Sequence, residues 1–268
     1  MLAIRPAAVA GLFYPADPDE LREAVDAFLD TAATPRAKAP VALIVPHAGY
    51  VYSGPVAASA YALLRNSGER YARVAVFGPS HRVFLRGLAA PRADVFVTPL
   101  GEIPVDREGV AAVARLHGVS ESEHAHALEH SLEVQLPFLQ RVLGSFSLVP
   151  FVVGDAAPED VARVIETLAE DARTLVVISS DLSHYHGYDE ARRLDARTVE
   201  RILGLATDID HEQACGATPI NGALAWARRR GLTVQLLDLR NSGDTAGDRS
   251  RVVGYSAFAF HEAGGSAR

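Results

Sequence analysis

The chain has 268 residues, of which 49% are hydrophobic and 22% are charged, and 26 basic against 33 acidic residues leave a net charge of −7. An acidic chain of this kind offers no basic surface for nucleic acid or for an anionic membrane. Its single cysteine excludes an intrachain disulfide and fits the cytoplasm, and we expect neither a secretory signal nor a transmembrane helix, because no long apolar stretch begins or interrupts the sequence.

The first half of the chain predicts alternating strands and helices. Residues 1–16 have the pattern of a strand or a loop. Asp17 and Pro18 are typical of an N-cap and a first helical residue, Glu20 completes a capping box, and the helix is expected to run to about Asp30. Apolar runs and helical spacing then predict strands at 41–46 and 73–77, helices at 55–64 and 106–116, and β structure, as a hairpin or mixed edge, at 87–105.

The second half continues the same alternation. A long helix is expected at 125–143, with Pro137 as a kink or a break. The further elements are strands at 148–153, 174–180, 233–239 and 252–260, and helices at 158–170, 189–204 and 218–229. Alternation of strands and helices predicts an α/β/α sandwich around a central mixed, mostly parallel sheet. With no repeat, low-complexity segment or linker, residues 1–268 are expected to form a single domain.

Histidines follow three of the predicted strands. His47, His81 and His184 each come after an apolar run, and Asp244 follows a fourth. In an open α/β sheet, ligands bind beyond the carboxyl ends of the strands, so these side chains are expected to share one crevice. Two imidazoles and one carboxylate form the facial triad that holds non-haem Fe(II), and a further histidine could serve as acid and base. Taken singly, each histidine could instead be a structural residue.

A second pattern points to zinc. The run from His126 to His130 matches H-x-x-E-H, the inverted zinc-protease motif, with Glu129 as the base. Spacing of four residues would place both histidines on one face of the predicted helix. We favour the alternative that His130 alone reaches the crevice, because a five-residue match arises easily by chance in a chain with ten histidines.

Other polar positions carry two interpretations each. Tyr50 and Tyr52 could line a pocket or pack beneath the helix that follows them. Cys215 could be a soft ligand or a nucleophile, although a buried structural cysteine before a helix is the favoured interpretation. The segment 241–245 could equally be a plain turn, since Asn, Gly and Asp are turn formers.

Seven motifs lie in order along almost the whole chain: AGLFYP (10–15), PHAGYVYSG (46–54), GPSHR (78–82), EHSLEVQLPFLQ (129–140), SSDLSHY (179–185), CGATPI (215–220) and NSGDT (241–245). Together they resemble the Memo family, which includes the B component of the bacterial AmmeMemoRadiSam system. The Memo fold is similar to that of type III extradiol dioxygenases, which open catechols with Fe(II). The resemblance therefore implies an extradiol-dioxygenase-like α/β fold.

The resemblance also implies roles for individual residues. His47 and His81 would be metal ligands, with Asp244 as the third ligand and Asp248 as the neighbouring alternative. Animal Memo proteins place a cysteine, and extradiol enzymes a glutamate, where Asp244 aligns. His184 would be the catalytic acid and base, with His130 in the same pocket. Asp181 would orient the His184 ring or cap a helix. The remaining residues expected at the pocket are Tyr50, Tyr52, Ser53, Glu129 and Cys215.

We therefore expect a metal-dependent oxidoreductase of dioxygenase type that acts on a small, catechol-like aromatic with O₂. Fe(II) is the expected cofactor, with Cu or Zn as alternatives. Two other functions stay open: a non-catalytic metal- or peptide-binding protein of the signalling type, as for animal Memo proteins, and a zinc-dependent hydrolase with the same ligands. Family association implies a functional link to AMMECR1-like and radical SAM proteins. Neither a nucleic acid nor a membrane is an expected partner, and the oligomeric state stays open.

Overall fold

A large mixed sheet forms the centre of the computed structural model, which describes residues 2–33, 39–65 and 70–263. The nine strands of this sheet lie in the order β10-β12-β2-β9-β3-β8-β4-β7, and β11 pairs along β12. Their bounds are β2 Ala42–Val45, β3 Arg73–Pro79, β4 Leu88–Ala90, β7 Val119–Glu121, β8 Ser147–Val153, β9 Thr174–Ser179, β10 His184–His186, β11 Thr233–Asn241 and β12 Val252–His261.

The four strands in the middle of the sheet, β2, β9, β3 and β8, are all parallel. Nearly all of their residues are buried, because helices cover both faces of the sheet. Antiparallel pairs join this centre to the outer strands at β12–β2 and β8–β4. Farther out, β10 and β11 pair antiparallel with β12, and β4 and β7 are parallel to each other. This mixed sheet between helices, parallel in its centre, confirms the predicted fold class.

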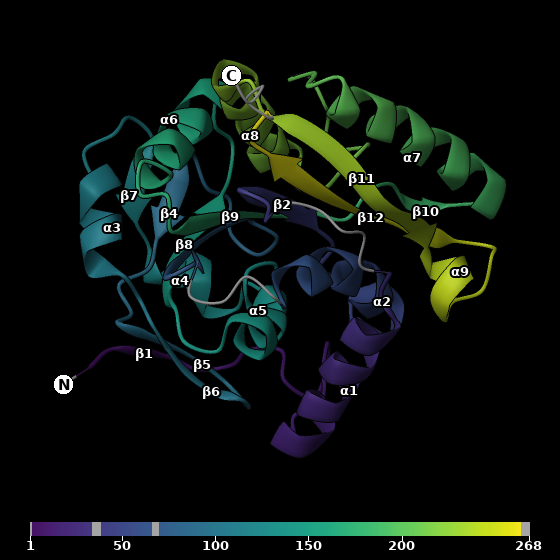
Figure 1. The fold of residues 1–268 in the computed structure, drawn as a ribbon, viewed down its shortest axis with the longest axis horizontal. Helices are drawn as coiled ribbons and strands as arrows, with labels where there is room; N and C mark the ends of the chain where they lie inside the picture. The colour runs from purple at the N-terminus through teal and green to yellow at the C-terminus, as the bar shows by residue number, and fades with distance from the viewer. Residues whose placement is uncertain (1, 34–38, 66–69, 264–268) are drawn as a thin grey trace, which may run out of the picture.

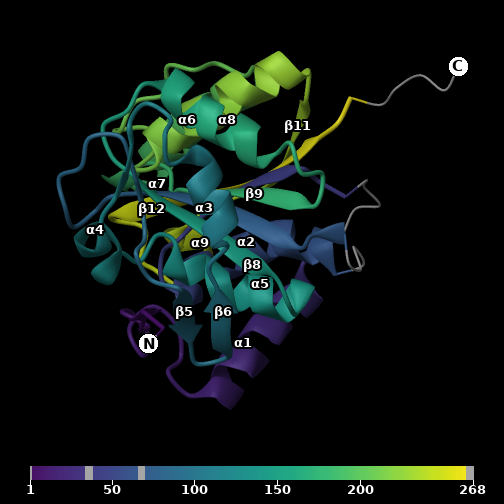
Figure 2. The same ribbon diagram turned by 90° about the vertical axis from the view of Figure 1, so that its left-hand side faces the viewer.

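Two helix layers cover the sheet. Figure 1 shows α6, α7 and α8 on one side and α1, α2 and α5 on the other, and the turned view of Figure 2 separates the same two layers. Among the described residues the helices are α1 Pro18–Thr31, α2 Tyr50–Tyr61, α3 Arg107–Val113, α4 Glu123–Ala127, α5 Leu136–Leu143, α6 Pro158–Leu168, α7 Tyr188–Leu203, α8 Ala217–Arg230 and α9 Ser242–Thr245. None of these helices is both long and apolar enough to cross a bilayer.

A second, small sheet lies beneath the main one. It contains β1 Ile4–Arg5, β5 Val95–Thr98 and β6 Gly101–Pro104, in the order β1-β5-β6. The pair β5–β6 is antiparallel, so the predicted hairpin is confirmed. The N-terminal residues therefore begin the chain as an edge strand of this sheet.

Local signals place α1 correctly. The Asp17 side chain accepts hydrogen bonds from the backbone N–H groups of Asp19 and Glu20, and Pro18 begins the helix. A side-chain oxygen at the N-cap satisfies donors that the first turn leaves unpaired. Leu21, Val25 and Leu29 then line the buried face of the helix.

The predicted long helix at 125–143 is wrong. The chain forms α4, a turn, a 3₁₀ segment at Glu133–Gln135 and then α5, in which Pro137 stands near the N-terminus. Proline is tolerated in a first turn because its missing N–H would be unpaired there. Leu132, Leu136 and Leu139 are buried, but Leu128, with which the apolar spacing begins, is 65% exposed, so the spacing did not mark one helical face.

The second helix begins earlier than expected, at Tyr50 rather than near Pro55. The Tyr50 backbone N–H donates to the Phe13 carbonyl at 2.8 Å, and its hydroxyl donates to the Val134 carbonyl at 2.8 Å. These two buried contacts, both with distant segments, hold the turn that precedes Pro55 in a helical conformation.

A buried ion pair anchors the N-terminal segment under the sheet edge. Arg5 and Glu133 are 5% and 0% exposed and lie in direct contact. Arg5 also donates to the backbone carbonyls of His126 and Glu129. Glu133 accepts from the Tyr14 hydroxyl and from two backbone N–H groups, so every Arg5 nitrogen and both Glu133 oxygens have a hydrogen-bond partner.

We expect Arg5→Met to destabilise the protein by about 3–5 kcal/mol, because it leaves the Glu133 carboxylate buried without its partner. Arg22→Met is the matched control: Arg22 pairs with Asp19 on the exposed face of α1, and its loss should cost about 0–1 kcal/mol. Urea unfolding of both variants measures the difference. Equal losses of stability would contradict the anchoring role of Arg5.

Candidate metal centre

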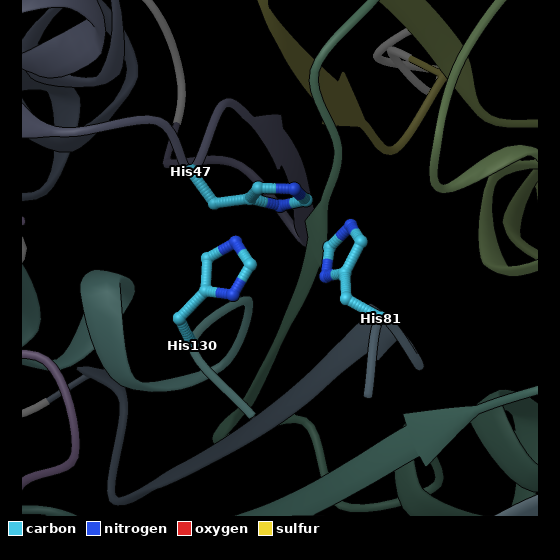
Figure 3. A group of neighbouring side chains, drawn as sticks. All are labelled: His47, His81 and His130. Atoms are coloured by element: carbon cyan, nitrogen blue, oxygen red, sulfur yellow. The ribbon is translucent and has the colours of Figure 1, made fainter. Parts of the chain in front are cut away.

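The carboxyl ends of the central strands bring three histidines together. His47 follows β2, His81 follows β3, and His130 lies in the turn between α4 and the 3₁₀ segment. Each residue offers one ring nitrogen, and these atoms all lie within 4.8 Å of one another. Figure 3 shows the three rings pointing toward a common space. Of the three, only His130 comes from outside the strand ends.

A buried serine decides which nitrogen His47 presents. The Ser179 hydroxyl donates to the Ser131 carbonyl at 2.6 Å and accepts from the Gln135 side-chain amide at 2.8 Å. Its remaining capacity is as an acceptor, so the His47 Nδ1, 2.8 Å away, carries the proton and donates. His47 Nε2, with Cys215 Sγ 3.3 Å away, is then the ring nitrogen that keeps a lone pair, which a metal would take in place of this thiol contact.

A buried carboxylate does the same for His81. The Glu129 side chain, 1% exposed, accepts from His81 Nδ1 at 2.9 Å and from the His81 backbone N–H at 2.7 Å. It also accepts from the backbone N–H groups of His130 and Ser131. Burial opposes ionisation of Glu129, but these hydrogen bonds, His81 foremost, outweigh it and lower the pKa of Glu129 to about 2. Glu129 therefore orients one candidate ligand and the backbone of another.

His47 and His130 are held in the neutral form that metals require. Burial, followed by the nearby His81, lowers the pKa of His130 to about 4, and the same two causes lower the pKa of His47 well below 6.5. The Phe13 ring, 4.6 Å from the His130 ring, closes one side. Three imidazoles with an open side match the donor set of a divalent transition metal. The residues present therefore fit such an ion.

The third ligand that the sequence indicated lies elsewhere. The Asp244 carboxylate closes a capping box at the start of α9, where it accepts from the Asn241 backbone N–H and from the Tyr188 hydroxyl. The strand before it, β11, is separated from β2 by β12, so its end is displaced from the central crevice. The structure groups His130, and not Asp244, with His47 and His81.

The H-x-x-E-H motif does not form a site of the protease type. His126 and His130 lie on either side of the end of α4 rather than on one helical face. The His126 ring is 2% exposed and hydrogen-bonds through Nε2 to the Ala89 carbonyl, which gives it a structural role. Glu129 has its oxygens occupied by four donors. The preference for His130 alone in the crevice agrees with this arrangement.

A cavity of about 560 Å³ opens beside the three histidines. This volume lies within the range of about 300–1,000 Å³ that is usual for small-molecule sites. Besides His47, His81 and His130, its walls include Phe13, Tyr52, Asp181, His184, Tyr185, Ser242, Asp248, Arg251 and Tyr255.

The chain reaches His184 by crossing the end of β2. The Ser180 N–H donates to the Val45 carbonyl and the Leu182 N–H donates to the Gly254 carbonyl, so the segment after β9 passes over β2 to pair with β12. Asp181, on this crossing, accepts from the His47 backbone N–H at 2.7 Å, and burial raises the pKa of its carboxyl. Among the described contacts, Asp181 thus holds the His47 loop, and no hydrogen bond joins it to the His184 ring.

Of the five residues expected at the pocket, one lines the cavity and the others lie behind its wall. Of the five, Tyr52 lies on the wall. Tyr50 and Ser53 donate to backbone carbonyls inside the protein, and Glu129 lies behind His81. Cys215 Sγ lies 3.3 Å from His47 Nε2, and burial raises the pKa of this thiol to about 12.

Sequence reasoning missed several wall residues. Phe13 and Tyr185 stand within motifs that had been recognised, but nothing local marked their side chains as facing a cavity. Arg251 stands just before β12 and Tyr255 lies within it, and the sequence indicated this segment only as a closing strand.

We expect His130→Ala to lose bound metal, because it removes one of three converging nitrogens. Asp244→Asn and His126→Gln should keep the metal, since neither side chain points to the group. Metal content after dialysis against limiting Zn²⁺ measures this. If His130→Ala retained the metal and Asp244→Asn lost it, the facial triad of His47, His81 and Asp244 that the sequence indicated would be correct instead.

We expect Glu129→Gln to weaken metal affinity by about 10–100-fold, the usual effect of altering a group that orients a ligand histidine. The glutamine amide would present N–H groups where backbone N–H groups now donate. Glu123→Gln, on the exposed side of α4, is the control. Competition with a chromophoric chelator measures affinity, and circular dichroism verifies the fold. Unchanged affinity in Glu129→Gln would exclude the orienting role.

The chain is similar over nearly its whole length to proteins of one family. The family model described as Memo-like protein matches residues 5–259. MEMO1 family protein MK0963 of Methanopyrus kandleri is 38% identical over 96% of this chain and 98% of its own, and a MEMO1 family protein of Aquifex aeolicus is 35% identical over 97% and 100%. The crystal structure of the uncharacterized protein JW3007 from Escherichia coli K12 shares the fold, with a TM-score of 0.56 at 14% identity, over 83% of this chain and 100% of that one. The chain therefore belongs to the Memo-like family.

Proposed function

We propose that this protein is a metal-dependent enzyme of the extradiol-dioxygenase type, acting on a small catechol-like aromatic with O₂. His47, His81 and His130 would hold the divalent metal, with Fe(II) as the first candidate. The observation that carries the proposal is the convergence of three histidine ring nitrogens at an open cavity. The resemblance to extradiol enzymes supports the redox chemistry and the choice of iron.

A bound divalent metal would supply Lewis acidity toward the paired oxygens of a chelating substrate. The protein's own residues would do the rest. His184, on the cavity wall, would accept the proton of a substrate hydroxyl group and later return it. Phe13, Tyr52 and Tyr255 would pack against the aromatic ring and exclude water.

A zinc-dependent hydrolase is the second candidate, and one observation favours it. The three ligands are all histidines, the set that holds catalytic zinc in carbonic anhydrase, whereas the iron facial triad contains a carboxylate. In this case His184 would transfer protons to or from the attacking water. The cytoplasmic location stays a prediction from the sequence, and the link to AMMECR1-like and radical SAM proteins stays a prediction from the family.

The test begins with metal analysis of protein purified without oxygen, followed by assays with a catechol panel and with ester substrates. His184→Ala should keep the metal and lower turnover by about 10²–10⁴-fold, the usual contribution of a general acid or base. His47→Ala should lose both the bound metal and the turnover. His186→Ala is the matched control, since His186 lies on the same strand and pairs with Glu190.

The outcomes separate the candidates. Iron with oxygen uptake on a catechol supports the dioxygenase, whereas zinc with ester hydrolysis supports the hydrolase. Metal loss in His184→Ala equal to that in His47→Ala would make His184 a ligand and remove it as the acid and base. A metal-loaded protein that turns over neither class favours a binding protein.

A further inference from the structure

We propose that Arg251 is a specificity-determining residue of the cavity, which binds a carboxylate group carried by the aromatic ligand. The identity of that ligand as the substrate rests on the proposed function, but the binding site does not. The preferred ligand is therefore an aromatic acid rather than an uncharged catechol. Arg251 stands just before β12, on the wall that it shares with His184 and Tyr185.

The Arg251 guanidinium is held in place without a counter-ion. Its central carbon lies 5.0 Å from the centre of the Tyr185 ring, within the range of a cation–π contact. It forms no ion pair with any carboxylate in the part of the chain that the structure describes. A guanidinium presents five N–H donors in a planar fork that matches a carboxylate. On a cavity wall, such a group is a ready anion receptor.

The residue beneath it has an unusual backbone. Tyr185 has φ 63°, in the left-handed region that side chains other than glycine seldom adopt. Backbone strain of this kind gathers where a fold positions a functional group. Here it directs a largely exposed tyrosine ring along the cavity wall, against Arg251. The tyrosine thus orients the arginine.

The two carboxylates of the cavity are already engaged. Asp181 accepts from the His47 backbone N–H at 2.7 Å. Asp248 accepts from the Ser250 backbone N–H at 2.7 Å and from the Ser250 hydroxyl. Asp181 therefore turns a lone pair toward the His47 loop, and Asp248 turns one toward its own loop. The Arg251 guanidinium, on the same wall, forms an ion pair with neither carboxylate.

The same segment offers a matched control. Arg249 also stacks on a tyrosine, with 4.3 Å between its guanidinium carbon and the centre of the Tyr188 ring. It is exposed like Arg251 but is absent from the cavity wall. Removing either arginine changes the net charge equally, so a difference between the two variants reports position rather than overall charge.

The experiment uses the full chain stripped of metal and titrated with benzoate and with benzamide, its uncharged counterpart, by calorimetry at low ionic strength. Benzoate should bind more tightly than benzamide. Arg251→Met should lower the affinity for benzoate by about 10–100-fold, the loss expected for a charge-assisted hydrogen bond, and leave the affinity for benzamide unchanged. Tyr185→Leu should weaken benzoate less, and Arg249→Met should not change it.

A second measurement compares 3,4-dihydroxybenzoate with catechol on the zinc-loaded protein, where no oxidation occurs, in case the metal-free chain is unstable. The preference for the acid should again require Arg251. Equal affinity for benzoate and benzamide, or equal losses in Arg251→Met and Arg249→Met, would overturn the proposal. Absence of turnover with any metal would count against the proposed function alone, because neither titration depends on catalysis.

Discussion

The buried carboxylate of Glu129 joins two parts of the candidate metal centre. One of its oxygens accepts from the His81 ring and from the backbone of the turn that carries His130, and the other accepts from the His81 backbone. The turn itself is neither helix nor strand, so no regular backbone ladder stiffens it. The neighbouring Arg5–Glu133 pair supplies the stiffness by tying this turn to the N-terminal segment. Glu129 can then hold two candidate ligands in one geometry.

This arrangement gives the N-terminal segment a part in the site. Tyr14 donates to Glu133, and the next residue back, Phe13, places its ring against His130 and on the cavity wall. The Phe13 carbonyl also accepts from the first turn of α2. Segments far apart in sequence thus depend on one another. A buried polar network of this kind is costly unless every member is paired, and here the carboxylates are.

Electrostatics and topology act together at the edge of the sheet. Burial and mutual proximity keep His47 and His130 neutral, which is the state that binds a metal. Parallel strands bring His47 and His81 to the same edge, on either side of the end of β9. The antiparallel strand β12 lies between β2 and β11. Asp244, which follows β11, is therefore displaced from the edge where His47 and His81 lie.

The sequence by itself determined the class of fold, most strands and helices, and two of the three converging histidines, because apolar runs and breakers are local signals and parallel strands must end at one edge. Only the tertiary structure decided the third. His130 lies in a turn that the helical spacing of apolar residues disguised, and the position of Asp244 was inferred from its own strand alone, without the neighbouring strands. The same holds for Phe13, Arg251 and Tyr255: their place on one wall depends on the pairing of distant segments, which no local pattern records.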